Sequence, residues 1–511
     1  MPCFNQHMKR KTFAMNFQKL FLLCCCILAA GSVRAQNDAD ALRYSMIQPG
    51  GGTARSLGAG GAFGALGADF SSLSINPAGI ALYHGNEFTF SPQFESIHTS
   101  SSFDSTLSSG NRNNFNFSNV GLVFTSKNKN EKSEWKSVHF GFGMNRMQSY
   151  HSSDYFYGIN YQNSLMDHYA ASANGSTTND LLNNDPFGAG LAYDAGLILP
   201  GSPDSTYYYP QAYFPGAVSQ ERSSVTRGAY KEYLISMGGN YGDKLYLGLT
   251  IGIDDLNYKY NSDYTEKDVD NLYDTFNSFT LNETVHTSGT GVNVKGGLIY
   301  RVNDYFRLGA SGSSPTYFSM TDTYANSIVS DMGVNGTYDV NSPQGKFNYN
   351  LTTPWRVTGS AAFIFKKYGF LSVDYDYLDY SSMFFTFNSG GTDARAAEQQ
   401  INNDILAKYG AASNLRIGAE GAIDIFRIRA GVDFCSTPFK DQISNYGADY
   451  SSRTYSGGLG VREKGYSLDL AYNRTLSKTF YQPYLLNNQS VPGSLISNTI
   501  SNITLTLGLR F

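Results

Sequence analysis

Apolar and polar residues alternate along many short segments of this chain. In the last segment every second residue is apolar: Ile503, Leu505, Leu507, Leu509 and Phe511. The same alternation recurs upstream at residues 138–145, 245–254, 355–365, 371–377, 415–423, 428–434 and 468–472. A period of two places apolar side chains on one face of a β-strand and polar ones on the other. The pattern therefore predicts an all-β protein whose strands each have one apolar face.

The connections between the strands alternate in length. About fourteen strands can be placed, starting near residues 86, 113, 136, 226, 244, 284, 305, 350, 369, 411, 427, 452, 465 and 498. Short links such as Gly242-Asp243 and Lys366-Lys367 alternate with long ones such as 150–225, 261–283, 321–349 and 389–410. Short turns at one end and long loops at the other are typical of transmembrane barrels. We therefore predict a transmembrane antiparallel β-barrel of about 14 strands over residues 86–511. A soluble sandwich or propeller is the alternative, in which loop lengths would not sort in this way.

The first 35 residues have the features of a secretory signal peptide. Basic residues between Lys9 and Lys19 precede an apolar run at 20–30 and the small-residue site Val33-Arg34-Ala35, so we expect cleavage after Ala35. The apolar run is too short to span a membrane as a helix. Four of the five cysteines lie in this segment, so we expect no internal disulfide in the mature chain. Export and a barrel together predict the outer membrane of a Gram-negative bacterium.

The mature chain is acidic. Removal of residues 1–35 leaves 33 basic residues against 42 acidic ones, a net charge of about −9. This balance disfavours nucleic acid as a partner.

A small-residue segment lies between the signal peptide and the first strand. Residues 50–67 and 69–79 are too rich in glycine to form a core of their own. Because a barrel of this strand count has a lumen that can be plugged, we expect residues 36–85 to form a hatch inside it. Within the hatch, Asn76 can turn the backbone, Pro77 fixes φ, and Ala78 and Gly79 permit close approach to the wall. A simple turn into the first strand is the alternative interpretation of these four residues.

These residues resemble a known family. The resemblance rests on Gly58, Gly60 and Gly61, on the run from Ser74 to Gly79 just before the first strand, on Thr353-Pro354-Trp355, and on the terminal Phe511. Together they make the whole mature chain similar to the FadL and toluene-transport family of outer-membrane proteins. A terminal aromatic residue on an amphipathic strand also resembles the signal by which the barrel assembly machinery recognises its substrates.

The resemblance implies a channel and not an enzyme. Members take up long-chain fatty acids or other hydrophobic small molecules passively. Apolar extracellular loops capture the molecule, which then reaches a site beside the hatch and moves past it or sideways through the wall. We accordingly expect outer-membrane lipid around the barrel and hydrophobic small molecules as partners.

An apolar stretch in the long third connection is the candidate for capture. Its members are too apolar for a simply solvated loop: Leu165, Met166, Leu191, Leu197 and Ile198. Packing against neighbouring loops is the equally weighted alternative.

Inside the lumen, the strand phase directs Lys295 and Arg356 inward, among other charged residues of both signs. An anionic head group in an apolar tunnel needs a cationic partner, which makes these two residues candidates for contact with it. A salt-bridge lattice that braces the barrel is the alternative that we favour. Gly141 and Gly143 also face inward, on strand three, where family members have a kink that opens a side exit. Making room for the hatch is the slightly preferred interpretation of both glycines.

Other function classes have less support in the sequence. His151 and His168 could serve a haem or hemin receptor, but two loop histidines are weak evidence. A barrel-borne hydrolase is a further alternative, although no nucleophile elbow or zinc-helix motif is present. A porin for small polar solutes would need a lumen without a hatch. We expect neither a cofactor nor a bound metal.

Overall fold

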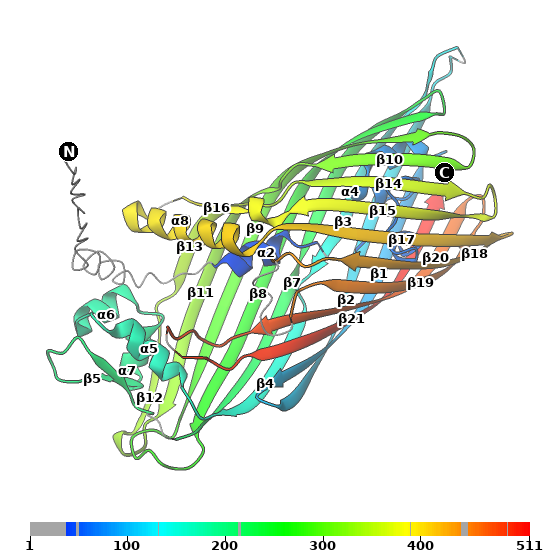
Figure 1. Cartoon of the computed structure of the whole chain (residues 1–511). Coiled ribbons are helices and arrows are strands. Elements are labelled where there is room, and N and C mark those ends of the chain that lie inside the picture. Colours follow the sequence, from blue (N-terminus) through cyan, green and yellow to red (C-terminus); the bar gives the residue numbers. More distant parts are fainter. Residues whose placement is uncertain are drawn as a thin grey trace, which may run out of the picture.

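The wall of the molecule is one antiparallel sheet that closes on itself (Figure 1). In this computed structural model, β1 (Glu87–Phe103) pairs with β2 on one side and with β21 (Ser494–Arg510) on the other. The result is a closed barrel of 14 strands, which confirms the predicted fold class. The structure describes residues 37–47, 51–130, 132–212, 216–388, 390–440, 448–487 and 489–511. The expected signal peptide lies outside the described residues.

The remaining strands follow one another around the wall in chain order. They are β2 (Thr106–Lys127), β3 (Trp135–Ser149) with β4 (Ser152–Asn160), β7 (Val218–Tyr241), β8 (Leu245–Asp268), β9 (Ser278–Arg301), β10 (Phe306–Ser313) with β11 (Tyr317–Asp331), β13 (Gly345–Thr352) with β14 (Arg356–Ile364), β15 (Gly369–Asp379) with β16 (Phe384–Phe387), β17 (Ala411–Ile423), β18 (Phe426–Cys435), β19 (Ser452–Arg462) and β20 (Tyr466–Tyr481). On β21, Ile503 and Leu505 are exposed on the outside whereas Thr504 and Thr506 are buried inside. The alternation in the sequence therefore corresponds to an apolar exterior and a polar lumen.

Several strands continue far beyond the length needed to cross a membrane. β7, β8 and β9 each have 24 residues, compared with the roughly 10 residues of a membrane-crossing strand. The loops expected at 261–283 and 321–349 are consequently mostly strand. The prediction missed these extensions because their outer face is polar, with exposed residues such as Lys259 and Asp263, while Phe279 and Leu281 are buried on the inner face.

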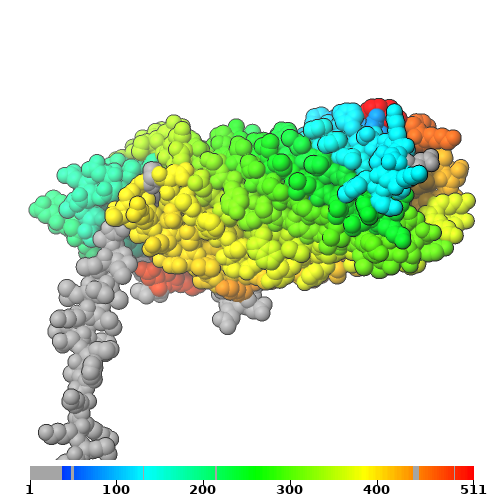
Figure 2. Space-filling model, turned by 90° about the horizontal axis from the view of Figure 1, so that it is seen from above, coloured from blue at the N-terminus to red at the C-terminus, as the bar shows by residue number. Residues whose placement is uncertain are grey.

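Folded segments cover the long-loop end of the barrel. The third connection contains α5 (Leu165–Ala173), α6 (Thr178–Asn184), α7 (Ala189–Asp194), β5 (Ile198–Pro200) and β6 (Tyr208–Pro210), and it projects as a separate lobe in Figures 1 and 2. The expected loop at 389–410 contains α8 (Gly391–Lys408). Two short helices, η2 (Gly333–Asn335) and η3 (Tyr380–Ser382), and the strand β12 (Thr337–Asn341) complete this end. Among the described residues, no helix is both long and apolar enough to cross a membrane.

The amino-terminal segment occupies the lumen. Its elements are α2 (Asp38–Ser45), α3 (Ala54–Gly58), α4 (Ser72–Ile75) and η1 (Pro77–Leu82). Apolar side chains of this segment, such as Phe63 and Phe70, are fully buried against the inner wall. We refer to residues 51–85 as the hatch and to α2 as the lid helix, because α2 lies beside α8 near the long-loop end (Figure 1).

Among the described residues, the hydrogen-bond ladder of the wall is interrupted between β2 and β3. The ladder between β2 and β3 runs from the Lys127–Ser137 pair to the Asn119–Asn145 pair and stops there. Beyond it, β4 leans onto the β1–β2 hairpin, where the Thr99 hydroxyl donates to the Ser153 carbonyl at 2.6 Å and Phe103 stacks on Phe156. Residues 106–118 of β2 therefore have no ladder partner on the β3 side.

Candidate ligand cavity and hatch

Inward-facing glycines let the hatch touch the wall. At ten wall positions on strands from β2 to β19, an added Cβ atom would meet hatch atoms at 3.2 Å or less: Gly121, Gly141, Gly143, Gly238, Gly248, Gly297, Gly309, Gly418, Gly431 and Gly458. We call this set the glycine girdle. Any larger side chain at most of these positions would overlap the hatch, so the hatch backbone and the wall must be matched to each other.

The four residues of the predicted hatch motif lie against this girdle. Pro77 backbone atoms fill the space left by Gly248, and the Asn76 side chain fills that left by Gly297. Ala78 is fully buried, and the Gly79 carbonyl accepts a hydrogen bond from the Ala68 backbone at 2.9 Å. The motif thus touches β8 and β9.

Asn76 joins three parts of the molecule. Its Oδ1 accepts from the Ala78 N–H at 3.1 Å, which caps η1. Its Nδ2 donates to the Gly64 carbonyl of the hatch at 2.7 Å and to the Leu298 carbonyl of β9 at 3.1 Å. With only 1% of its surface exposed, Asn76 replaces water as the partner of these groups.

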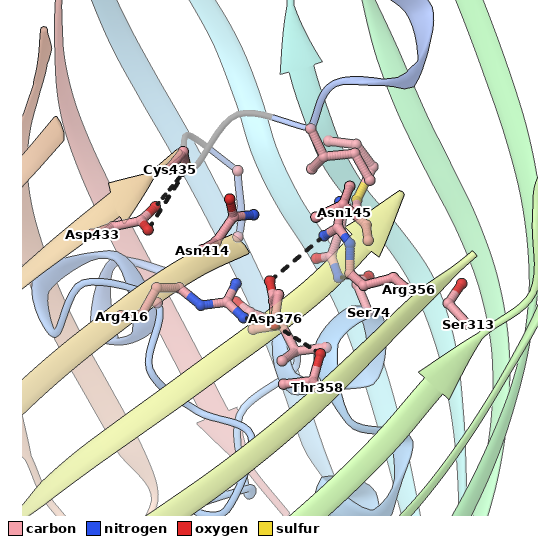
Figure 3. Close-up of a pocket in the computed structure, with 18 of the residues that line it drawn as sticks. Ser74, Asn145, Ser313, Arg356, Thr358, Asp376, Asn414, Arg416, Asp433 and Cys435 are labelled. Atoms are coloured by element: carbon pink, nitrogen blue, oxygen red, sulfur yellow. Dashed lines mark hydrogen bonds and ion pairs between the residues drawn. The ribbon is translucent and has the colours of Figure 1, made fainter. Parts of the chain in front are cut away.

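A central cavity lies between the lid helix, the hatch and the wall (Figure 3). Its volume is about 140 Å³, similar to that of a cavity that holds one benzene-sized ring. Apolar lining comes from the amino-terminal segment, including the hatch, and from the wall: Tyr44, Ile47, Leu57, Ile75, Met147, Tyr230 and Leu378. Lys295 and Arg356, the two residues proposed to meet a head group, both line it as well. The closed cavity has room for a head group or a ring, and a long tail requires the lid helix to move.

The two candidate cations differ in how far they are already neutralised. Lys295 forms an ion pair with Glu232 of β7, and their side chains are only 8% and 1% exposed. The Ser74 hydroxyl of the hatch donates to the same carboxylate at 2.6 Å. Lys295 therefore belongs to a buried network that joins hatch and wall, as expected for the bracing alternative.

Arg356 is less engaged. Its one carboxylate contact among the described residues is Asp376, 4.0 Å away, and its side chain is 21% exposed. Asp376 is held more closely by Arg416 at 2.6 Å and by the Thr358 hydroxyl at 2.8 Å, as Figure 3 shows. Because Asp376 has these closer partners, Arg356 keeps donors for a ligand.

The lid helix closes the cavity on the long-loop side. Tyr44 is buried among Tyr150 and Tyr258, and its hydroxyl donates to the Thr287 hydroxyl at 3.0 Å. Burial raises the pKa of the Tyr44 phenol well above its usual range, so the phenol keeps its proton. At the other end of the helix, Asp38 accepts from Lys408 at 2.8 Å and from the Tyr409 hydroxyl at 2.9 Å.

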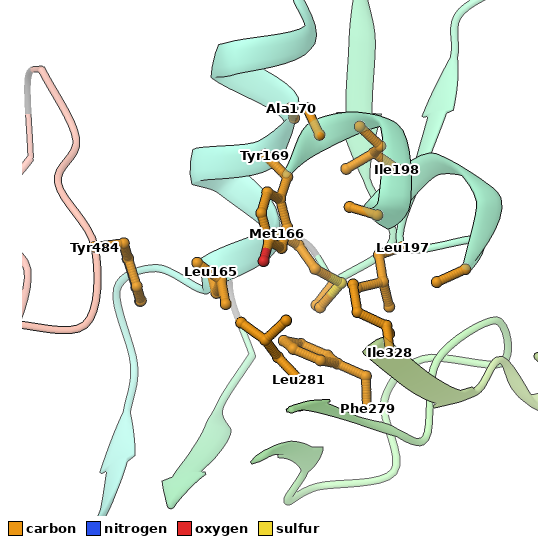
Figure 4. Packing of buried hydrophobic residues seen from close by; sticks show 14 of the residues in the cluster. Leu165, Met166, Tyr169, Ala170, Leu197, Ile198, Phe279, Leu281, Ile328 and Tyr484 are labelled. Carbon is orange, nitrogen blue, oxygen red and sulfur yellow. The ribbon is translucent and has the colours of Figure 1, made fainter. Parts of the chain in front are cut away.

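The apolar residues proposed for capture form a protein core. Leu165, Met166, Leu191, Leu197 and Ile198 are all at most 5% exposed. They pack with the extended ends of the wall strands, through Phe279, Leu281 and Ile328, and with the loop residue Tyr484 (Figure 4). This is the arrangement that the packing alternative describes, and direct capture by these side chains requires the core to open.

The two glycines proposed for a side exit lie below the break in the wall. Gly141 pairs with Val123 and Gly143 with Gly121, inside the intact part of the β2–β3 ladder. An added Cβ at Gly141 would lie 2.9 Å from Leu73 and Ile80 of the hatch, and one at Gly143 would overlap Phe70. The break begins two residues beyond Gly143, at Asn145.

Two elements of this site were not predicted from the sequence. Tyr233 and Ile235 of β7 face outward, so Glu232 faces the lumen. The alternation along this strand was therefore sufficient to predict that Glu232 points inward. The lid helix begins with a capping box formed by Asn37 and Asp40, and this pair was recognisable as a helix start.

The site offers little for metal or haem chemistry. Within the described residues, no group of three or more His, Cys, Asp or Glu side chains is placed to hold a metal ion. His151 lies between β3 and β4, whereas His168 lies on α5 in the lobe, and neither lines the central cavity.

The fold of this chain, a closed barrel with its amino-terminal segment in the lumen, is similar to that of solved structures. The fold matches a FadL homologue from Pseudomonas aeruginosa with a TM-score of 0.55 and 12% sequence identity. The match covers 91% of this chain and 100% of the homologue. It matches the toluene transporter TodX of Pseudomonas putida over 91% of this chain and 99% of that one, with 12% identity and a TM-score of 0.52. No protein-family model and no curated protein matches the chain. The chain therefore has the FadL-type fold, as its sequence motifs indicated.

Proposed function

We propose that this protein is an outer-membrane channel for the passive uptake of hydrophobic molecules that carry a polar head group, such as long-chain fatty acids. The observation that carries the proposal is the central cavity, where Arg356, whose nearest carboxylate among the described residues is 4.0 Å away, lies beside an apolar lining. A carboxylate that leaves water for such a site needs a charged donor, and a guanidinium offers two parallel ones. The likeness of the fold to a FadL homologue and to a toluene transporter supports the same class of cargo.

The lumen is obstructed both above and below the central cavity. The lobe and the lid helix cover the long-loop end, and the glycine girdle holds the hatch below the cavity. Such a lumen suits one bound molecule at a time better than free flow of polar solutes, as in a porin. In this proposal cargo enters through the lobe, moves the lid helix, rests beside Arg356, and leaves past the hatch or through the break between β2 and β3. Gly141 and Gly143 then serve mainly to seat the hatch near that break.

The proposal places the short-turn end in the periplasm. Phe511 is exposed at this end, where the barrel assembly machinery would recognise it. Lipid surrounds the apolar exterior, which includes Leu468, Leu470 and Leu505. No catalytic role is proposed for any residue.

Uptake of labelled oleate and labelled toluene by cells that produce the protein tests the proposal. We expect Arg356→Gln to lower oleate uptake about tenfold and to leave toluene uptake unchanged, since a charge-assisted contact is worth about 1.5–3 kcal/mol. Arg474→Gln, which removes a charge from the exposed outer face of β20, is the matched control. Equal uptake by producing cells and by cells that lack the protein would reject the channel. A hemin titration with a Soret shift, or ester hydrolysis by the purified protein, would favour the two alternatives.

A further inference from the structure

A second cavity lies on the other side of the hatch, at the short-turn end of the barrel. We call it the vestibule. Its volume is about 700 Å³. Hatch residues 66–68 and 81–84 form its roof, and the ends of strands from β2 to β19 form its walls. In the proposed orientation, the vestibule faces the periplasm.

The vestibule is strongly cationic. Nine basic residues line it: Arg55, Lys127, Lys136, Arg301, Arg307, Lys366, Lys367, Arg427 and Arg462. Only two acidic residues, Asp243 and Glu420, share the lining. The mature chain as a whole has more acidic than basic residues. The excess of positive charge therefore belongs to this cavity and does not reflect the general composition.

The two acidic residues do not neutralise this charge. Glu420 is already bound by Arg429, which does not line the vestibule, at 2.6 Å. Its contacts to Arg55 at 3.9 Å and Arg427 at 4.0 Å are longer. Asp243 accepts a hydrogen bond from the Asn240 amide at 2.7 Å.

Five of the cations have no carboxylate within 4.0 Å among the described residues: Lys127, Arg307, Lys366, Lys367 and Arg462. The Nε atoms of Arg55 and Arg462 are buried without a hydrogen-bond partner. Like charges repel, and a concave wall of low dielectric strengthens their field. The unpaired donors and the repulsion are both relieved when an anion enters.

Arg55 connects the vestibule with the central cavity. It lies on the five-residue helix α3, where Ser56 and Leu57 line the central cavity while Arg55 lines the vestibule. Its guanidinium donates to the Ala68 carbonyl at 2.7 Å and stands over the Phe63 ring. A single turn of the hatch thus lines both cavities.

We propose that the vestibule binds the anionic head group, carboxylate or phosphate, of an amphiphile below the hatch. This inference rests on the proposed function and narrows it: the preferred cargo is anionic, and it leaves past the hatch on the periplasmic side. An anionic phospholipid of the inner leaflet offers the same chemistry, and the experiment separates the two sources.

Native mass spectrometry of the full-length protein in a neutral detergent tests the site. The probes are dodecanoate, dodecanol and phosphatidylglycerol. Arg307→Gln/Arg462→Gln removes two vestibule cations, and Lys366→Gln/Lys367→Gln removes two more that lie in an exposed turn. Arg453→Gln/Arg474→Gln, on the exposed outer faces of β19 and β20, is the control with the same change in charge.

We expect the wild-type protein to bind two dodecanoates but one dodecanol. Both vestibule variants should bind the second dodecanoate about tenfold more weakly, and the control should behave like the wild type. If phosphatidylglycerol and not dodecanoate is lost from the vestibule variants, the site binds lipid of the inner leaflet. Unchanged binding of both anions by both vestibule variants would overturn the inference. In that case, the proposed function would still hold if one dodecanoate binds and its binding depends on Arg356. If neither dodecanoate nor dodecanol binds, the proposed function would be rejected as well.

Discussion

Asn76→Ala should release the hatch without unfolding the barrel. The substitution removes three hydrogen bonds, from Ala78 and to Gly64 and Leu298, at a residue that is 1% exposed. Each is worth about 1 kcal/mol net, so the closed hatch should lose about 3 kcal/mol. Because about 1.4 kcal/mol corresponds to a factor of ten, the open population should rise roughly a hundredfold. The ladders of the wall strands do not depend on this side chain.

Hydrogen exchange measured by mass spectrometry reads out this change. Amides of residues 52–82 should exchange roughly a hundredfold faster in the variant, whereas amides of β8 and β20 should keep their protection. Asn128→Ala is the matched control, since Asn128 makes similar contacts in an exposed turn, including one to the Trp135 carbonyl at 2.9 Å. Unchanged exchange in the hatch would show that Asn76 does not anchor it. Faster exchange throughout the barrel would show that hatch and wall are one cooperative unit.

Three further predictions follow from the same contacts. Gly248→Val should displace Pro77 and raise ion conductance in planar bilayers, whereas Gly296→Val, next to open space, should not; equal conductance would refute the role of the girdle. Asp38→Asn weakens the contacts of Lys408 and Tyr409 with the lid helix by about 1 kcal/mol. Dodecanoate should therefore bind about fivefold faster in stopped-flow measurements. An unchanged rate would show that the lid helix does not limit entry. Met166→Ala should destabilise the lobe by about 2–4 kcal/mol, seen as faster proteolysis within residues 161–212, and slower capture in this variant would argue against opening of the core as the entry step.

The wall was largely predictable from sequence because lipid imposes one simple rule. Outward residues must be apolar, so most strand starts, such as those at Leu245, Gly369 and Ala411, lie within a few residues of their predicted positions. The rule no longer applies beyond the membrane, where the outer faces of β8 and β9 are polar and apolar residues such as Leu256 and Phe279 lie on the inner faces. It also gives no signal for α8, where only Ile401 and Ile405 are buried.

The site was predictable in its parts but not in its pairings. The phase of the strands directs Lys295 and Arg356 inward, and both line the central cavity. Glu232 neutralises Lys295, whereas Arg356 keeps free donors. This difference depends on which strands are neighbours and on their register, which the sequence does not show. Of the glycine girdle, only Gly141 and Gly143 were expected to make room for the hatch. The other positions could not be recognised, since each glycine has a meaning only opposite the hatch atom that fills its place.

The course of the amino-terminal segment through the lumen has a practical consequence. The chain begins its described path at Asn37 beside α8, descends past the cavity, and reaches the short-turn end at β1 (Figure 1). With the long loops outside the cell, an epitope joined ahead of Asn37 would emerge at the cell surface while its attachment point stays clamped inside the pore. Antibody staining of intact cells that carry such a fusion would report the orientation of the barrel. It would also show whether the amino-terminal segment runs through the lumen.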